Sequence, residues 1–375
     1  MHTARRLPSV SIVPPSSPPQ PSSPPSLPAP LPGLQGLPGL PGSAAEPGSG
    51  PASAALLDGL LDDAALLATP LTSTPGPAGP EPAGPPSELS ALVEAAVGQH
   101  RALRDRTDGE VLAGPLLVPA GLAEAVVGSL GPGDHPLRVL LVPDRAAAGV
   151  PGRAAPDVAQ VGEQLEALRR ARNLFLDDDR VELVGVQVSL PRDLPAADGA
   201  RVVVDALDFT APAWLELDPG LADAGQALTV LAEDGAEGLA LAAGGPHPLP
   251  AGSLAAGLRA AVDRELTVRA VGGPLPWVRP AERPADPSPE RATTVPHGAL
   301  NLICAVRAAL NGAEVEQLTA ILAATTPAPL LSAVRQMSGA DAVVVRAFLA
   351  AVPVAPVAST LDELTRLGLL PTDLG

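Results

Sequence analysis

The sequence predicts an α/β protein: a (β/α)8-type barrel, complete or short of one strand, with C-terminal helices. From residue 88 onward, short apolar runs alternate with longer helical patterns, an order typical of parallel strands joined by right-handed crossovers. Runs such as VLLVP are almost continuously apolar, which suits strands covered on both faces. The segment 88–375 is also long enough for a barrel, which usually needs about 250 residues.

Seven apolar runs are expected to form strands. They are 116–119, 138–143, 181–190, 214–217, 238–243, 266–271 and 348–355. Helical patterns follow the first six at 122–130, 158–171, 199–207, 221–232, 254–262 and, in the C-terminal part, 298–311, 315–324, 330–337 and 361–369. One further hidden strand would bring the count to eight.

An open doubly wound parallel sheet is the alternative architecture. A dinucleotide-binding sheet of that kind needs G-x-G-x-x-G at its first strand exit. The exits here read LLVPAGLAE and LLVPDRAAAG and lack that motif, so the barrel is favoured.

Residues 1–87 are rich in Pro, Ser and Gly and are expected to form a disordered leader ahead of an α/β barrel-like domain at 88–375. Within the leader, the segment 53–69 (SAALLDGLLDDAALLAT) places leucines at helical spacing opposite Asp58, Asp62 and Asp63. It is expected to be a short amphipathic helix. It is either a docking motif for an apolar groove on a partner or, as we favour, a transient helix or an upstream frame translated from a wrong start.

Composition excludes several classes of function. The chain contains no Lys, so all 24 Lys+Arg residues are Arg, and lysine-dependent Schiff-base or P-loop chemistry is impossible. The net charge of −17 argues against a nucleic-acid partner. The single cysteine, Cys304, permits no intramolecular disulfide and suits a cytoplasmic protein. The N-terminal apolar stretch is too short for a signal peptide, and no segment is long enough to suggest a membrane span.

Carboxylates at strand ends are the candidate catalytic groups, because barrel ligands bind at the carboxyl ends of the strands. Asp144 and Glu216 stand at two such ends and are candidate acid-base residues. The alternative for each is a helix N-cap, which suits the neighbouring Asp218 well. No HExxH or EF-hand motif occurs, so no metal and no cofactor is expected.

Two glycine pairs predict a ligand-binding rim. Gly244-Gly245 and Gly272-Gly273 each follow a predicted strand, where backbone N–H groups can approach an anion. Arg269 on the second of these strands would add charge. The alternative is a tight turn, and the prolines that follow both pairs favour it because they remove N–H donors.

Three polar residues share one face of the helix at 298–311. His297, Asn301 and Cys304 are spaced at i, i+4 and i+7. His297 is a candidate catalytic residue and Asn301 a candidate ligand-binding residue. Cys304 and His297 are two turns apart, about 10 Å along the axis, which is too far for a thiolate–imidazole pair.

The segments LALAAGG (239–245), TVRAVGGPLPWVR (267–279) and HGALN (297–301) resemble a family of uncharacterised (β/α)-barrel-like proteins from high-GC bacteria. The resemblance implies basic residues where Ala240 and Ala242 stand, a lysine where Arg269 stands, and histidines where Leu275 and Pro276 stand. It therefore implies a degenerate site in this member.

Three hypotheses for function follow. The first is a barrel that binds a small anionic metabolite at the Gly244/Gly272 rim without turnover. The second is a lyase or isomerase that uses Glu216 or Asp144 as a base, with or without a divalent metal. The third is a scaffold that recruits a protein partner through 53–69. The first is favoured, because Pro and Ala stand where chemistry would need donors and bases.

Overall fold

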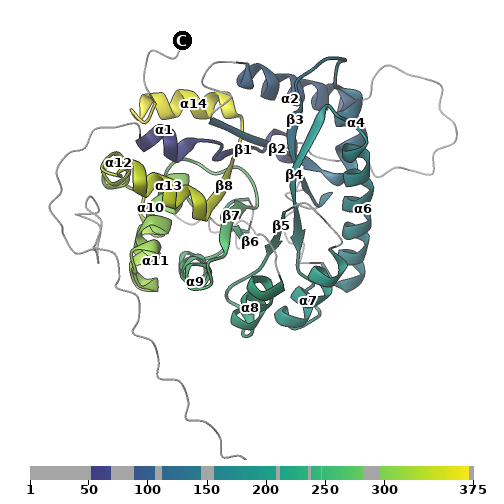
Figure 1. Ribbon diagram of the computed structural model, residues 1–375. Helices are drawn as coiled ribbons and strands as arrows, with labels where there is room; N and C mark the ends of the chain where they lie inside the picture. Colours follow the sequence, from purple (N-terminus) through teal and green to yellow (C-terminus); the bar gives the residue numbers. More distant parts are fainter. Residues whose placement is uncertain are drawn as a thin grey trace, which may run out of the picture.

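The structure is a computed structural model that describes residues 52–68, 88–105, 112–144, 156–207, 212–234, 238–245, 247–281 and 295–370. Over these residues, eight parallel strands form a closed barrel in sequence order, with helices around it (Figure 1). The prediction of a (β/α)8-type barrel is confirmed. The open sheet is wrong, because β1 pairs with β8 and closes the barrel.

The strands lie close to the predicted apolar runs. They are β1 (Leu61–Asp63), β2 (Ala113–Pro119), β3 (Leu137–Val142), β4 (Val181–Ser189), β5 (Ala213–Glu216), β6 (Gly238–Ala242), β7 (Thr267–Val271) and β8 (Leu349–Val354). In β3, Leu140 and Val142 pack inside the barrel, whereas Val139 and Leu141 pack toward the helices. Both faces of the strand are buried, which is why the run reads as continuously apolar.

The first strand corrects the predicted domain boundary. The segment 52–68, which we assigned to a disordered leader, forms α1 (Ala52–Leu57), β1 and the 3-10 helix η1 (Ala65–Ala68), so the barrel domain begins before residue 88. The closing register pairs Leu61 with Val352 and Asp62 with Pro353. The rest of the predicted leader lies outside the described residues.

The predicted amphipathic helix at 53–69 is therefore wrong beyond Leu57. Its leucines at 56, 57, 60, 61 and 66 are buried in the core of this chain, and α1 packs against α13 (Gly339–Phe348). The leucine spacing suggested one continuous helix. It gave no sign of the three-residue strand β1, which separates α1 from η1. Since these leucines are already covered, they are not free to dock on a partner.

Helices cover the outside of the barrel (Figure 1). Those before β7 are α2 (Glu88–Arg104), α4 (Ala123–Gly128), α6 (Val158–Leu176), α7 (Ala196–Ala206), α8 (Ala224–Asp234) and α9 (Ala251–Val262). Helix α6 begins at a capping box, in which the Asp157 carboxylate accepts from the Gln160 N–H at 2.8 Å. Such reciprocal bonds satisfy donors that a helix start leaves unpaired.

A group of helices lies between β7 and β8. It comprises α10 (Ala299–Leu310), α11 (Val315–Ala323), α12 (Pro327–Arg335) and α13, and α14 (Val357–Arg366) follows β8. Helix α10 is buried at all but its last residue. Within it, the Arg307 guanidinium donates to the Ala333 carbonyl at 3.0 Å. Among the described residues, no single helix is long and apolar enough to cross a membrane, and only α11 with α12, bent by 116°, passes as a pair.

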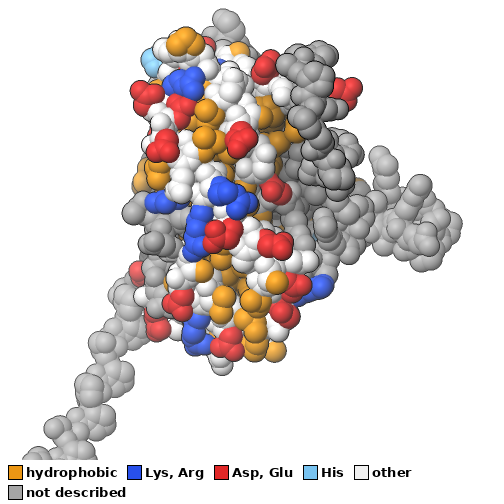
Figure 2. All heavy atoms as spheres, turned by 90° about the vertical axis from the view of Figure 1, so that its right-hand side faces the viewer, with side chains coloured by type: hydrophobic (Ala, Val, Ile, Leu, Met, Phe, Trp, Pro, Cys, Tyr) orange, Lys and Arg blue, Asp and Glu red, His pale blue; other side chains and the backbone are white. Residues whose placement is uncertain are grey.

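Acidic and Arg side chains alternate with apolar ones over the face formed by α2, α4, α6 and α7. Figure 2 shows that the Arg side chains on this face stand beside acidic ones rather than in one broad basic patch. On this side, therefore, the described surface offers no large cationic area.

Candidate functional site

A buried ion pair lies inside the barrel. Asp62 on β1 accepts a hydrogen bond from Arg269 on β7, and β8 lies between these two strands. Asp62 is 1% exposed and Arg269 is 4% exposed. The guanidinium also stacks on Trp214 of β5, with its central carbon 4.4 Å from the ring centroid, a geometry that attracts a cation to the ring face.

Burial changes the proton affinity of the acid in this pair. It raises the pKa of Asp62 from 3.8 to about 6, although Arg269 acts in the opposite direction. Taking a carboxylate out of water costs more than one nearby guanidinium returns. Asp62 therefore takes up a proton at mildly acidic pH.

Three polar atoms of this cluster lack hydrogen-bond partners within the described part of the chain. They are Asp62 Oδ1, Arg269 Nε and Trp214 Nε1. Two of these atoms carry N–H donors, and a buried donor without an acceptor costs about 1–3 kcal/mol. The cluster thus has two unpaired donors and one unpaired acceptor, and a water molecule or an anion could accept from the donors.

A small cavity borders the ion pair. Its lining includes Asp62, Gln187, Arg269, Gly272 and Gly273. The volume open to the centre of a water molecule is only about 10 Å³, which is roughly the room that one water molecule needs. Arg269 and the second glycine pair thus line the same cavity, and the space beside them is limited.

Glu216, at the end of β5, has hydrogen-bond donors close by. Ser189 Oγ donates to Glu216 Oε2 at 3.0 Å, and the Gln187 side chain also bonds to this carboxyl. Burial nevertheless raises the pKa of Glu216. Because Gln187 also lines the cavity, Glu216 is one hydrogen bond away from it.

The glycine pairs pack against each other. A Cβ atom on Gly245 would lie 1.7 Å from the Gly272 carbonyl oxygen, and one on Gly244 would lie 2.5 Å from that of Gly273. Gly245, Gly272 and Gly273 also have positive φ angles. These positions therefore require glycine for backbone reasons, and only the second pair borders the cavity.

His297 and Asn301 hold loops together. His297 Nε2 donates to the Leu249 carbonyl at 2.8 Å, and Nδ1 lies 3.3 Å from the guanidinium of Arg279. Burial lowers the pKa of His297, so the ring is neutral. Asn301 donates to the carbonyls of Ile321 and Ala324. Neither residue lines the cavity beside Arg269, so neither is placed as predicted for catalysis or ligand binding.

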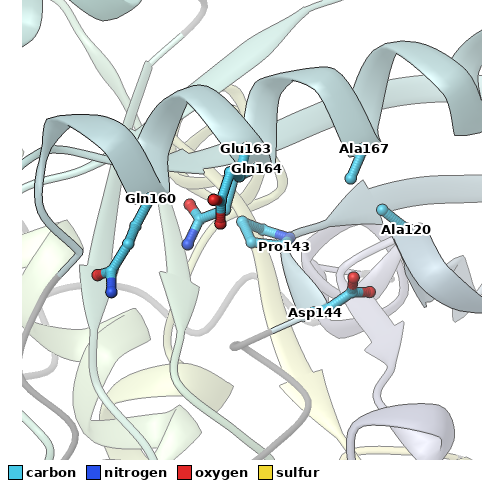
Figure 3. A pocket seen from close by; sticks show the side chains of 7 residues that line it. All are labelled: Ala120, Pro143, Asp144, Gln160, Glu163, Gln164 and Ala167. Atoms are coloured by element: carbon cyan, nitrogen blue, oxygen red, sulfur yellow. The ribbon is translucent and has the colours of Figure 1, made fainter. Parts of the chain in front are cut away.

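Asp144 lies at a different place, on the barrel rim. It borders an open pocket of about 170 Å³ between the ends of β2 and β3 and helix α6, together with Gln160, Glu163 and Gln164 (Figure 3). Its Oδ1 accepts from the Gly121 N–H at 2.6 Å. Asp144 thus holds the turn after β2. This is a structural role, as in the N-cap alternative, but the N–H group belongs to the segment after β2. Asp218 makes a similar local bond to the Gly220 N–H.

A buried Asp–His pair was missed by sequence reasoning. Asp63 Oδ2 lies 3.1 Å from His100 Nδ1, and Asp63 Oδ1 accepts from the Ala65 N–H at 3.0 Å. A carboxylate only accepts hydrogen bonds, so Nδ1 carries the proton. The pair ties α2 to the end of β1, on the opposite face of that strand from Asp62.

Sequence reasoning also missed Asp62, Gln187 and Trp214. Asp62 stood in the segment assigned to the leader. Trp214 was the available signal: it is one of only two tryptophans and stands on a predicted strand two residues before Glu216. Within the described residues, no three His, Cys, Asp or Glu side chains are grouped to hold a metal ion.

The comparisons with known proteins found no counterpart. No family model matches the chain, and no curated protein and no solved structure matches it significantly. The resemblance to a family of barrel-like proteins stays a prediction, and the site must be interpreted from its own geometry.

Proposed function

We propose that this barrel binds a small anion at its carboxyl-terminal mouth, without turnover, and that Arg269 is the cationic group. The observation that carries the proposal is the excess of buried donors: Arg269 Nε and Trp214 Nε1 have no acceptor among the described residues. Buried polar groups are nearly always hydrogen-bonded. An anion in the cavity would offer an acceptor to Arg269, which lines it, and would also gain from the positive charge.

The cavity limits the size of the ligand. It has room for about one water-sized group, so the proposal favours a carboxylate or similar oxyanion of which one oxygen atom enters the cavity. Gly272 and Gly273 on the wall let such a group approach the backbone. Around Arg269, the interior side chains of Trp214, Ala240 and Val271 supply no nucleophile, and the carboxylate of Asp62 is paired with the guanidinium, which supports binding without turnover.

Tryptophan fluorescence can test this proposal. In a Trp277→Phe protein, Trp214 is the remaining tryptophan and reports on the guanidinium stacked on it. Sodium formate should change its emission in a saturable way at mildly acidic pH. Arg269→Gln should abolish this response, whereas Arg201→Gln, at an exposed Arg paired with Asp198, should leave it intact. Equal formate binding by the Arg269→Gln protein would refute the proposal.

A second candidate function is acid-base catalysis, as in a lyase or isomerase, with Glu216 as the base. It is supported by the burial that raises the pKa of Glu216 and by the two donors that orient the carboxyl. A base of this kind works best when its pKa is near the working pH. Glu216→Gln should then abolish proton exchange from a bound carbonyl compound without weakening formate binding. Asp144 is less suited, because its carboxylate already holds the Gly121 N–H.

The proposed site of action is the cytoplasm. Support comes from the one cysteine of the chain, Cys304, which is buried and unpaired, since extracellular proteins more often rely on disulfides. The scaffold hypothesis is not retained, because the leucines of 53–69 are part of the barrel core.

A further inference from the structure

We infer that Asp62 is a displaceable internal counter-ion: an anion that binds Arg269 replaces the Asp62 carboxylate, and Asp62 takes up one proton from solvent. This inference rests on the proposed anion binding and specifies how that binding is regulated. It predicts that the ligand binds together with a proton.

Among the residues that the structure describes, Arg269 has one ionic partner. Its Nη1 donates to Asp62 Oδ2, and both side chains are buried. An anion entering this cavity would place two negative charges beside one guanidinium in a water-poor interior. Unpaired buried charge is strongly unfavourable, so one of the two negative charges has to be neutralised.

The other charged groups that act on Asp62 are already engaged. They are Arg346 of α13 and Arg138 of β3. Arg346 donates to the carbonyls of Asp58 and Ala350 at 3.0 and 3.1 Å. Arg138 lies 3.5 Å from the carboxylate of Glu182. On β1 itself, Asp63 bonds to His100. Hydrogen bonds to carbonyl groups leave the positive charge of Arg346 in place, and it acts on Asp62 without lining the cavity. Of these three guanidinium groups, only that of Arg269 lines the cavity, so an entering anion would share this cation with Asp62.

Protonation of Asp62 would remove one of the two negative charges beside Arg269 and would give the unpaired Asp62 oxygen a hydrogen-bond partner. Asp62 Oδ1 has no partner among the described residues. A protonated carboxyl gains one O–H donor, so this oxygen could donate to the bound anion. The proton is within reach because burial holds the pKa of Asp62 at about 6.

The test measures formate binding to the wild-type protein across a pH series at constant ionic strength. Formate itself stays ionised throughout, so it does not contribute a titration. With one linked proton and a pKa of about 6, the affinity should fall about 50-fold between about pH 6 and about pH 8. Calorimetry in two buffers with different ionisation enthalpies should show an uptake of about one proton per formate bound at the upper end of this range.

Two variants isolate the residue responsible. Asp62→Asn should bind formate with an affinity that no longer depends on pH. Asp178→Asn removes a carboxylate that pairs with Arg180 and not with Arg269. This variant should keep the pH dependence of formate binding seen in the wild-type protein. If Asp62→Asn does not fold, the proton uptake of the wild-type protein decides alone.

The outcomes separate the two proposals. Formate binding with no proton uptake and no pH dependence would overturn the counter-ion role and leave the anion site standing. Absence of formate binding at every pH would overturn both.

Discussion

Replacing Asp62 with Asn tests whether this buried ion pair stabilises the fold or strains it. The substitution keeps the shape of the side chain and removes its charge. Folding raises the pKa of Asp62 from 3.8 to about 6, so the folded protein holds the proton more tightly than the unfolded chain. The contribution of Asp62 to stability is therefore complete below about pH 4 and is lost as the pH rises through about 6.

The size of this effect follows from the shift. A difference of about two pK units corresponds to about 3 kcal/mol of unfolding free energy. The Asn side chain stays neutral and does not lose this contribution. The full change extends below about pH 4, because the unfolded carboxyl is already partly ionised there. Between about pH 4 and about pH 7.5, the stability of Asp62→Asn should therefore rise by about 2 kcal/mol relative to that of the wild-type protein.

Urea unfolding of both proteins at several pH values provides the measurement, since the midpoint shifts with stability at a constant m-value. Asp178→Asn is the matched control with the opposite sign. Arg180 lowers the pKa of Asp178 to about 2, so that ion pair favours folding above about pH 4 and is lost on acidification. Asp178→Asn should be less stable than the wild-type protein at neutral pH.

The reasoning would be refuted if Asp62→Asn lost stability relative to the wild-type protein as the pH rose. That result would mean that Arg269 outweighs desolvation and lowers the pKa of Asp62. The counter-ion would then be held too tightly for an anion to displace it.

Three further predictions concern the fold. Leu61→Ala should cost about 3 kcal/mol in urea unfolding because Leu61 is fully buried in β1; a loss below about 0.5 kcal/mol would show that β1 is not part of the core. Gly245→Ala should lower the melting temperature far more than Gly312→Ala, since both have positive φ but only Gly245 meets a backbone oxygen; equal losses would contradict the close packing of the glycine pairs. The Cys304 thiol, whose pKa burial raises to about 12, should react with a thiol reagent at mildly alkaline pH only after unfolding; rapid labelling of the native protein would disagree with this burial.

Strands such as β3 and β6 were predicted because they bury both faces. In β3 and β6, almost every side chain is apolar, since one face meets the barrel interior and the other meets helices. An apolar strand sequence of this kind can be recognised without knowing which strands it pairs with. The closure of the sheet was harder to predict, because it depends on β1, whose three residues carry two aspartates.

The candidate site was predicted only in part, for a related reason. Arg269 and Gly272-Gly273 stand at a strand and its exit, and their position follows from local order. His297 and Asn301 carry suitable chemistry, but their hydrogen bonds to Leu249 and Ile321 depend on loops that meet only after folding.

The sequence by itself determined the parallel α/β order, the alanine- and leucine-rich core and the exclusion of lysine chemistry, because these depend on composition and local periodicity. Only the tertiary structure decided that Asp62 meets Arg269, because β1 and β7 come to lie on either side of β8. These two residues are 207 positions apart, and no local pattern encodes a pairing at that separation. The closure of the sheet on β1 brings the carboxylate into a water-poor interior, and that burial gives it the raised pKa on which the proposed proton-linked binding depends.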